Sequence, residues 1–187
     1  MSIDLVIAGL GYVGLPLARQ ACAAGLSVVG YDVSADVVSG VAAGQSHVHD
    51  VSDVDVATML VAGFAVTADP AVIGTADTVV LCVPTGLTPA GTPDLSAVRA
   101  VAEAVAARLG TGLLVVLEST SYPGTTDEVV RPILERGSGL RAGEDFHLAF
   151  SPERVDPGNA RFGIKNTPKI VSGHTPLCAK YCAAFYG

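Results

Sequence analysis

Three glycines near the amino terminus constrain the fold more than any other residues. Gly9, Gly11 and Gly14 form a Gly-x-Gly-x-x-Gly loop, which follows an apolar segment at residues 3–8 and opens an apolar stretch of helical length. A second apolar segment ends directly before Asp32. A strand, a glycine loop, a helix, a second strand and an acidic residue make up, in this order, a dinucleotide-binding unit. The pattern predicts a nucleotide-binding fold, although FAD enzymes and methyltransferases use similar loops.

Each residue of this unit has a physical role. We expect Gly9 to adopt a positive φ in a tight turn. Gly11 lacks a Cβ atom, so a pyrophosphate can approach the backbone, and Gly14 allows the helix to pack close to the strand. The helix N-terminus offers unpaired N–H groups to the phosphates. Asp32 can accept hydrogen bonds from both ribose hydroxyls and repels a 2′-phosphate. Because no Arg or Lys follows Asp32 before Arg99, the sequence favours NAD over NADP.

Short apolar segments alternate with helical stretches along the whole chain. This alternation predicts an α/β fold with a doubly wound, mainly parallel sheet of the Rossmann type, which has helices on both faces and is formed as one domain by residues 1–187. The expected strands are 5–8, 27–31, 64–67, 78–83, 113–117, 146–150 and 170–171, and the expected helices are 13–24, 34–42, 53–62, 95–109, 125–135 and 175–185. Expected helix caps are Ser52 or Asp53, Asp94, and a capping box formed by Thr125 and Glu128.

Charge and hydropathy exclude several classes of protein. The formal net charge of −7 argues against a nucleic-acid-binding protein. No apolar run approaches the roughly 18 residues of a membrane span, and the segment 1–4 lacks the basic start of a signal peptide. We therefore expect a cytoplasmic chain that contacts neither nucleic acid nor membrane. The four cysteines are then expected to be reduced thiols.

The sequence gives no sign of a metal site. Cys178 and Cys182 lie in an expected helix without two further ligands nearby. We interpret His47 and His49 as residues of a solvated loop. Basic residues gather in the second half of the chain, where Arg154, Arg161, Lys165 and Lys169 follow one another around one expected loop. This loop is either an ordinary solvated surface or the rim of a docking site for an anionic ligand beside the cofactor.

Three polar loops follow buried strands, at residues 84–93, 118–122 and 151–154. In open α/β sheets ligands bind at the carboxyl ends of the strands, so we expect these loops and the glycine loop to face one crevice. Thr120 supplies a hydroxyl that can orient a water molecule or the cofactor. Glu153 is the carboxylate that we single out in these loops, because it follows a buried strand.

Four ordered segments of the chain resemble the nucleotide-sugar 6-dehydrogenases. The similarity is carried by Gly9-x-Gly11-Tyr12-Val13-Gly14-Leu15-Pro16, Cys82-Val83-Pro84-Thr85, Glu118-Ser119-Thr120-Ser121-Tyr122-Pro123-Gly124-Thr125-Thr126 and Ser151-Pro152-Glu153-Arg154-Val155-Asp156-Pro157-Gly158-Asn159. The third and fourth segments look most similar to the branch of the family that acts on UDP-N-acetylglucosamine or UDP-N-acetylmannosamine.

The resemblance implies a reaction and roles for residues. Such enzymes oxidise the sugar C6 alcohol to a carboxylate with two NAD, and a cysteine traps the aldehyde as a thiohemiacetal that becomes a thioester. By motif position, Tyr12, Val13, Asp32, Thr85 and Thr120 are expected to contact NAD. Thr120 is also expected to hold the hydrolytic water and Glu153 to act as acid and base. Arg154, Val155 and Asp156 are expected to contact the UDP-sugar substrate.

The sequence departs from the family pattern at two positions and in length. Val37 replaces a basic residue, and Gly86 replaces a proline. The family's nucleophilic cysteine, its long central helix, its UDP-binding domain and its usual oligomer interface belong to a second half that we expect to be absent from residues 1–187. The resemblance therefore implies the NAD-binding half of a homo-oligomeric dehydrogenase, inactive by itself. Two alternatives remain open at this point: a truncated, non-catalytic NAD-binding module, and a 2- or 3-hydroxyacyl-type NAD dehydrogenase of the same superfamily.

Overall fold

The computed structural model describes residues 3–154 and 167–187 of the chain. Its main sheet has seven strands in the order β3-β2-β1-β4-β7-β8-β9. Neighbouring strands from β3 to β8 are parallel, and β9 pairs with β8 in the antiparallel direction. The strands are β1 (Ile3–Ala8), β2 (Val28–Tyr31), β3 (Ala65–Thr67), β4 (Ala76–Leu81), β7 (Leu114–Leu117), β8 (His147–Phe150) and β9 (Ser172–Gly173). This order is that of a doubly wound sheet and confirms the predicted fold class.

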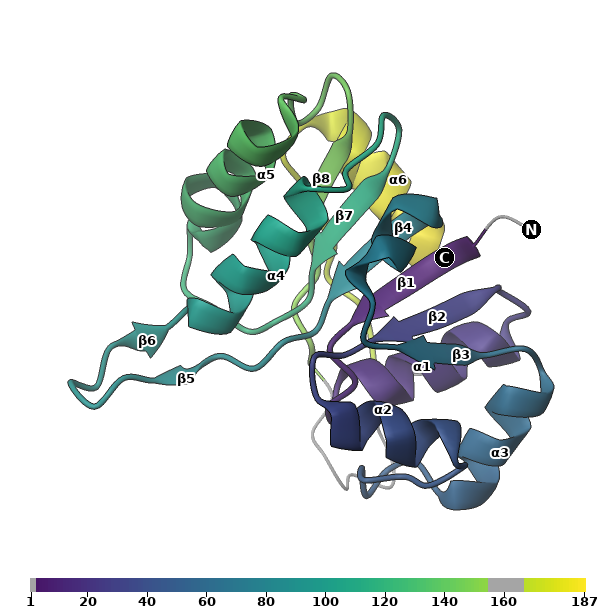
Figure 1. Ribbon diagram of the computed structural model, residues 1–187. Helices are drawn as coiled ribbons and strands as arrows, with labels where there is room; N and C mark the ends of the chain where they lie inside the picture. The colour runs from purple at the N-terminus through teal and green to yellow at the C-terminus, as the bar shows by residue number, and fades with distance from the viewer. Residues whose placement is uncertain (1–2, 155–166) are drawn as a thin grey trace.

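Helices cover both faces of the sheet (Figure 1). They are α1 (Gly14–Ala23), α2 (Ala35–Ala42), α3 (Asp53–Val61), α4 (Ser96–Ala106), α5 (Arg131–Ser138) and α6 (Pro176–Tyr186). Alternate strand residues point to opposite faces: Val6 and Ala8 belong to the apolar cluster with α4 and α5, whereas Leu5 and Ile7 belong to the cluster with α1, α3 and α6. Both faces are therefore buried, as the apolar strands require.

The helix termini are fixed by local side chains. Ser34 caps α2 by accepting the N–H of Val37, and Ser52, not Asp53, caps α3 in a capping box with Asp55. The carboxylate of Asp94 accepts the N–H of Ser96 at 2.9 Å, so it satisfies the first turn of α4, although the N-cap residue itself is Leu95. Such contacts satisfy N–H groups that have no partner inside the helix.

The predicted capping box of Thr125 and Glu128 is wrong. Residues Thr125–Val130 form a π-helical segment that precedes α5, and its N-cap is Gly124 with a φ of 93°. The Thr125 hydroxyl instead donates to the carbonyl of Tyr122 at 2.7 Å. A left-handed residue at this position turns the chain so sharply that the threonine side chain bonds to the preceding turn rather than to the segment that it begins.

Three further segments differ from the sequence-based expectations. A 3₁₀ helix at Pro70–Thr75 was not predicted. The turn-rich segment 84–93 contains the short strands β5 (Gly86–Leu87) and β6 (Pro93–Asp94), which form a hairpin extending away from the body of the domain (Figure 1). The last strand is 172–173 rather than 170–171, because the pairing edge of β8 selects Ser172 and Gly173.

The register of the sheet positions the candidate site. Ala8 of β1 pairs with Leu81 of β4, Leu81 with Leu117 of β7, and Leu117 with Phe150 of β8. The last residues of these strands therefore lie side by side, and the segments that follow them start at the same edge. Within the described ranges, no helix has the length and apolarity that crossing a bilayer requires.

Candidate cofactor cleft

The glycine loop leaves β1 at this edge. Gly9 has a φ of 96°, as predicted, and its N–H donates to the carbonyl of Tyr31 at 2.8 Å. A Cβ atom on Gly9 would lie 2.7 Å from the carbonyl oxygen of Cys82. Gly9 is therefore needed both for its backbone conformation and for the close approach of the loop to the end of β4.

The other two glycines differ in their surroundings. A Cβ atom on Gly14 would lie 1.9 Å from the carbonyl oxygen of Gly9 and 3.1 Å from the side chain of Ile7. This is the close packing of helix and strand that the sequence predicts. A Cβ atom on Gly11 would meet nothing within 4 Å. Gly11 thus leaves open space over the backbone, where a ligand can approach it.

The carboxylate of Asp32 is bound to the backbone on both oxygens. It accepts the N–H of Leu10 at 2.8 Å and the N–H of Ser34 at 2.9 Å. On the other side of Leu10, Nε2 of His47 lies 2.9 Å from the carbonyl oxygen, so this nitrogen carries the proton. Asp32 and His47 together hold the Leu10 peptide of the glycine loop. Each oxygen of Asp32 retains a lone pair for a ribose hydroxyl.

These elements enclose a cleft of about 400 Å³. Its lining includes seven of the eight cofactor residues predicted from the sequence, namely Gly9, Gly11, Tyr12, Val13, Asp32, Thr85 and Thr120. Gly14 is buried beneath the loop. The hydroxyl of Thr85 donates to the carbonyl of Thr120, which ties together the loops that follow β4 and β7. The glycine loop and the loops after β4 and β7 therefore line one crevice as expected, whereas the loop 151–154 does not line it.

His47 also lines the cleft. Its interpretation as a solvated loop residue was incomplete, because the sequence gives no sign that the segment after α2 returns to the glycine loop. Val37, which stands where the family often has a basic residue, lies in the same lining. His47 and Val37 thus contribute a polar and an apolar side chain to the same lining.

Glu153 is not in the lining of this cleft, but it bonds to the backbone of Glu118, which precedes the lining residues Ser119 and Thr120. Its N–H donates to the carbonyl of Glu118 at 3.3 Å, and one carboxylate oxygen accepts the N–H of Arg154 at 2.7 Å. The guanidinium group of Arg154 donates to the carbonyl of Pro168 at 2.9 Å. The predicted substrate residues Val155 and Asp156 lie outside the described residues, as do Arg161 and Lys165.

A second carboxylate, which the sequence analysis did not single out, lies beside Glu153. Glu118 follows β7 directly and is fully buried. It forms an ion pair with Lys169 and accepts a hydrogen bond from the Tyr186 hydroxyl at 2.7 Å. Lys169 is therefore not a free cation of a docking rim. The position of Glu118 after an apolar strand is the same signal that selected Glu153.

Three of the cysteines are held as neutral thiols. Burial raises the pKa of Cys82, which lines the cleft, well above its usual range, and the charge of Glu118 raises it further. Burial likewise raises the pKa of Cys22 and of Cys182 to about 11. A nucleophilic cysteine needs a lowered pKa, so none of these three is suited to trap an aldehyde.

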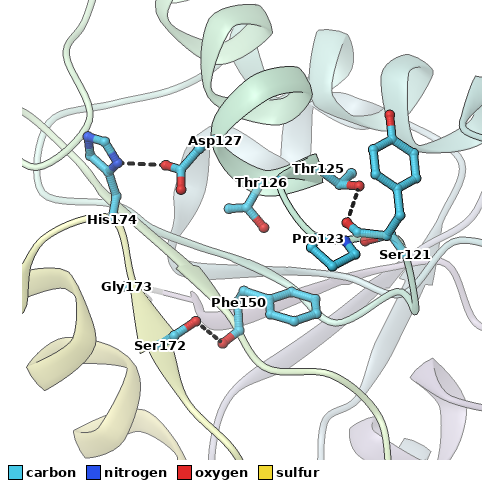
Figure 2. A pocket seen from close by; sticks show the side chains of 11 residues that line it. Ser121, Pro123, Thr125, Thr126, Asp127, Phe150, Ser172, Gly173 and His174 are labelled. Atoms are coloured by element: carbon cyan, nitrogen blue, oxygen red, sulfur yellow. Dashed lines mark hydrogen bonds and ion pairs between the residues drawn. The ribbon is translucent and has the colours of Figure 1, made fainter.

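A second pocket of about 310 Å³ is lined in part by the segment that follows Thr120 (Figure 2). It is bounded by residues 121–127, Phe150 and β9. Some of its polar groups are bonded to each other: Nδ1 of His174 lies 2.7 Å from a carboxylate oxygen of Asp127, and the hydroxyl of Ser172 donates to the carbonyl of Phe150 at 3.2 Å. In the described part of the chain, no group of three His, Cys, Asp or Glu side chains could hold a metal ion.

The cleft therefore has the features that a dinucleotide requires. The N-terminus of α1 starts at Gly14 without an acidic residue in its first turn, so its free N–H groups suit an anion. Open space over Gly11 and the carboxylate of Asp32 at the end of β2 suit a diphosphate and the adjoining ribose.

Comparisons with known proteins agree with this geometry. Residues 3–187 match the sequence profile described as the UDP-glucose/GDP-mannose dehydrogenase family, NAD binding domain. The chain is 33% identical over 185 residues to the UDP-N-acetyl-D-glucosamine 6-dehydrogenase of Pseudomonas aeruginosa, which covers 98% of this chain and 43% of that protein.

Solved structures give the same result. The UDP-D-ManNAc dehydrogenase of Pyrococcus horikoshii has a TM-score of 0.92 at 33% identity, with 98% of this chain and 44% of that chain covered. The NDP-N-acetyl-D-galactosaminuronic acid dehydrogenase of Methanosarcina mazei has a TM-score of 0.90, also at 33% identity, with 99% and 42% covered. The chain thus spans less than half the length of these relatives.

Proposed function

Because the chain belongs to the UDP-glucose/GDP-mannose dehydrogenase family, we propose that its cleft holds NAD for the oxidation of a UDP-N-acetylhexosamine. The observation that carries this proposal is the convergence of seven predicted cofactor residues on one cleft. The chain supplies the NAD-binding domain of such a dehydrogenase. The activity belongs to a protein that also contains the part of the relatives which this chain does not match.

Different residues of the cleft bind different parts of NAD. Backbone N–H groups near Gly11 and at the start of α1 bind the diphosphate, and Asp32 accepts from the adenosine ribose. Thr85 and Thr120, at the ends of β4 and β7, orient the nicotinamide end. NAD, when bound, supplies the hydride acceptor for the oxidation.

The loop that follows β8 serves the substrate side of the proposal. Glu153 takes up the proton of the sugar hydroxyl as a general base, and as an acid it donates a proton to the oxyanion that forms when the nucleophile adds to the aldehyde. Thr120 holds the water that completes the oxidation to a carboxylate. Arg154, Val155 and Asp156 contact the nucleotide sugar. Support for the substrate class comes from the relatives, two of which are named as dehydrogenases of UDP-N-acetylated sugars.

The first test compares NAD with NADP by calorimetric titration of the purified chain. We expect NAD to bind at least about tenfold more tightly than NADP, because a 2′-phosphate would lie against the carboxylate of Asp32. In Asp32→Asn this preference should shrink. The exposed neighbour Asp36 provides the matched control, since Asp36→Asn should keep the preference. Equal affinity for both cofactors in the unmodified chain would contradict the assigned role of Asp32.

The second test addresses catalysis by the chain alone. Mixed with NAD and UDP-N-acetylglucosamine or UDP-N-acetylmannosamine, the purified chain is expected to form no NADH, because the proposed activity also needs the part of the relatives that this chain does not match. NADH fluorescence measures the reaction, and a full-length relative serves as the positive control. Steady NADH formation by this chain would show that the second half is not needed.

A further inference from the structure

Four charged or hydroxyl-bearing side chains from four separate segments meet in one cluster. Glu118 comes from the end of β7, Glu153 from the segment after β8, Lys169 from the segment before β9, and Tyr186 from the end of α6. The Lys169 ammonium is paired with Glu118 and lies 3.8 Å from a carboxylate oxygen of Glu153. It also lies 4.8 Å from the centre of the Tyr186 ring. We call these four residues the Glu118 cluster.

Lys169 is shared unequally between its two carboxylates. The side chain of Glu118 is 0% exposed and that of Glu153 is 14% exposed. A carboxylate without water needs a cation or hydrogen-bond donors more than one that retains some solvent. Glu118 has both, because Lys169 contacts one of its oxygens and the Tyr186 hydroxyl donates to the other. Glu118 thus fixes the ammonium group, and Glu153 approaches it from the other side.

The other titratable groups that face Glu118 are thiols. Cys82 at the end of β4 and Cys182 on α6 both interact with its charge. The four side chains of the cluster thus include two carboxyl groups and one ammonium group, and the Glu118 side chain is fully buried. Burial raises the pKa of Glu118, the charge of Glu153 raises it further, and Lys169 and Tyr186 lower it. Protonation of one carboxylate therefore changes the pKa of the other.

The cluster is directly connected to the cofactor cleft. Ser119 and Thr120, which follow Glu118 in the chain, line the cleft, and so does Cys82. The hydroxyl of Ser119 donates to the carbonyl of Val83 at 2.7 Å, which ties the segment after β7 to the segment after β4. A change of charge at Glu118 or Lys169 therefore acts next to the residues that are proposed to orient NAD.

We propose that Glu118 and Lys169 are positioning residues for Glu153: Glu118 holds the Lys169 ammonium group, so that this cation stays paired whether or not Glu153 carries a proton. Without Glu118, each protonation of Glu153 would leave a partly buried ammonium group without a counter-ion, which is unfavourable. With Glu118 present, the Lys169 ammonium group pairs with Glu118 alone when Glu153 is protonated. It pairs with both carboxylates when Glu153 is ionised. This inference rests on the proposed acid–base role of Glu153.

The test follows the titration of Glu118 by NMR in the chain labelled with ¹³C at the glutamate side-chain carboxyl. The chain has six glutamates, and the Glu118 signal is the one that Glu118→Gln removes. If the proposal holds, Glu153→Gln moves the Glu118 midpoint to lower pH by at least about half a unit, because a like charge is removed. Lys169→Met moves the midpoint upward, and Lys169→Arg restores it to near the original value.

Matched controls separate this coupling from general effects of charge. Glu103 and Lys180 are exposed, so Glu103→Gln and Lys180→Met should leave the Glu118 midpoint in place. The proposal is overturned if the Glu118 midpoint is the same in Glu153→Gln as in the unmodified chain. This result does not depend on whether Lys169→Met folds. Calorimetric titration of the same samples with NAD tests the proposed function separately. If the unmodified chain does not bind NAD, the proposed function is refuted. The shift of the Glu118 midpoint still shows whether the two carboxylates are coupled.

Discussion

Gly14→Ala is expected to lower the free energy of unfolding by about 3 kcal/mol or more. The new Cβ atom would lie 1.9 Å from the carbonyl oxygen of Gly9, a backbone atom that cannot rotate away. Alanine would stabilise the first turn of α1 by at most about 1 kcal/mol relative to glycine, so the clash dominates. Urea denaturation followed by circular dichroism measures the change. A transition midpoint equal to that of the unmodified chain would show that α1 can shift without loss.

Gly11→Ala is the matched comparison for this prediction. Nothing lies within 4 Å of a Cβ atom at Gly11, so the free energy of unfolding should change by less than about 0.5 kcal/mol. The methyl group would occupy the space proposed for the diphosphate, and the affinity for NAD should fall at least about tenfold. The two variants thus separate a glycine needed for folding from one needed for the ligand. Unchanged NAD affinity in Gly11→Ala would place the diphosphate elsewhere.

The second large effect is expected for Lys169→Met. This substitution leaves the fully buried Glu118 carboxylate without its cation, and breaking a buried ion pair in this way lowers the free energy of unfolding by about 3 kcal/mol at neutral pH. The loss should shrink as the pH falls. Burial raises the pKa of Glu118 in the folded state above its unfolded value of about 4.3, so the folded state takes up the proton first, and stability returns as the pH drops through the folded pKa.

Urea denaturation at several pH values between about 5 and 8 measures this dependence. Lys180→Met, which removes an exposed lysine of α6, controls for the change in net charge and should show no such trend. The double variant Lys169→Met/Glu118→Gln should be more stable at neutral pH than Lys169→Met, because it carries no unpaired buried carboxylate. A loss of stability in Lys169→Met that is independent of pH would rule out Glu118 as its source.

The parts of the site that could be predicted from the sequence are those set by local rules. Gly9 needs a positive φ in a turn after a strand, and Asp32 follows the next strand; both positions can be seen in a short stretch of residues. Thr85 and Thr120 each follow a buried strand, and parallel strands bring their carboxyl ends to one edge. The fold class and the cofactor cleft were therefore predictable.

The Glu118 cluster could not be predicted in the same way. Glu118 and Lys169 are 51 residues apart in the sequence, and Glu118 and Tyr186 are 68 apart. Their contact depends on the antiparallel return of β9 along β8 and on the packing of α6. Neither has a local signal: the apolar pair Ile170 and Val171 suggested a strand two residues too early, whereas the residues that pair with β8 are Ser172 and Gly173.

The π-helical segment shows how a correct motif can mislead. The spacing of Thr125 and Glu128 is that of a capping box, and such a box does form at Ser52 and Asp55. The difference lies in the preceding residue. Gly124 has a φ of 93°, which takes the Thr125 side chain away from the N–H groups that it would need to accept. Local spacing is therefore informative only when the backbone before it is known.

The central place of β1 has a consequence for synthesis of the chain. Leu5 pairs with Val28 on one side and with Thr78 on the other. The ribosome releases β1, β2 and β3 before β4, so the growing chain has an apolar strand with one open edge until residue 81 has emerged. Open strand edges are templates for aggregation. A pause in translation between β3 and β4 would prolong this state, whereas one after β4 would not.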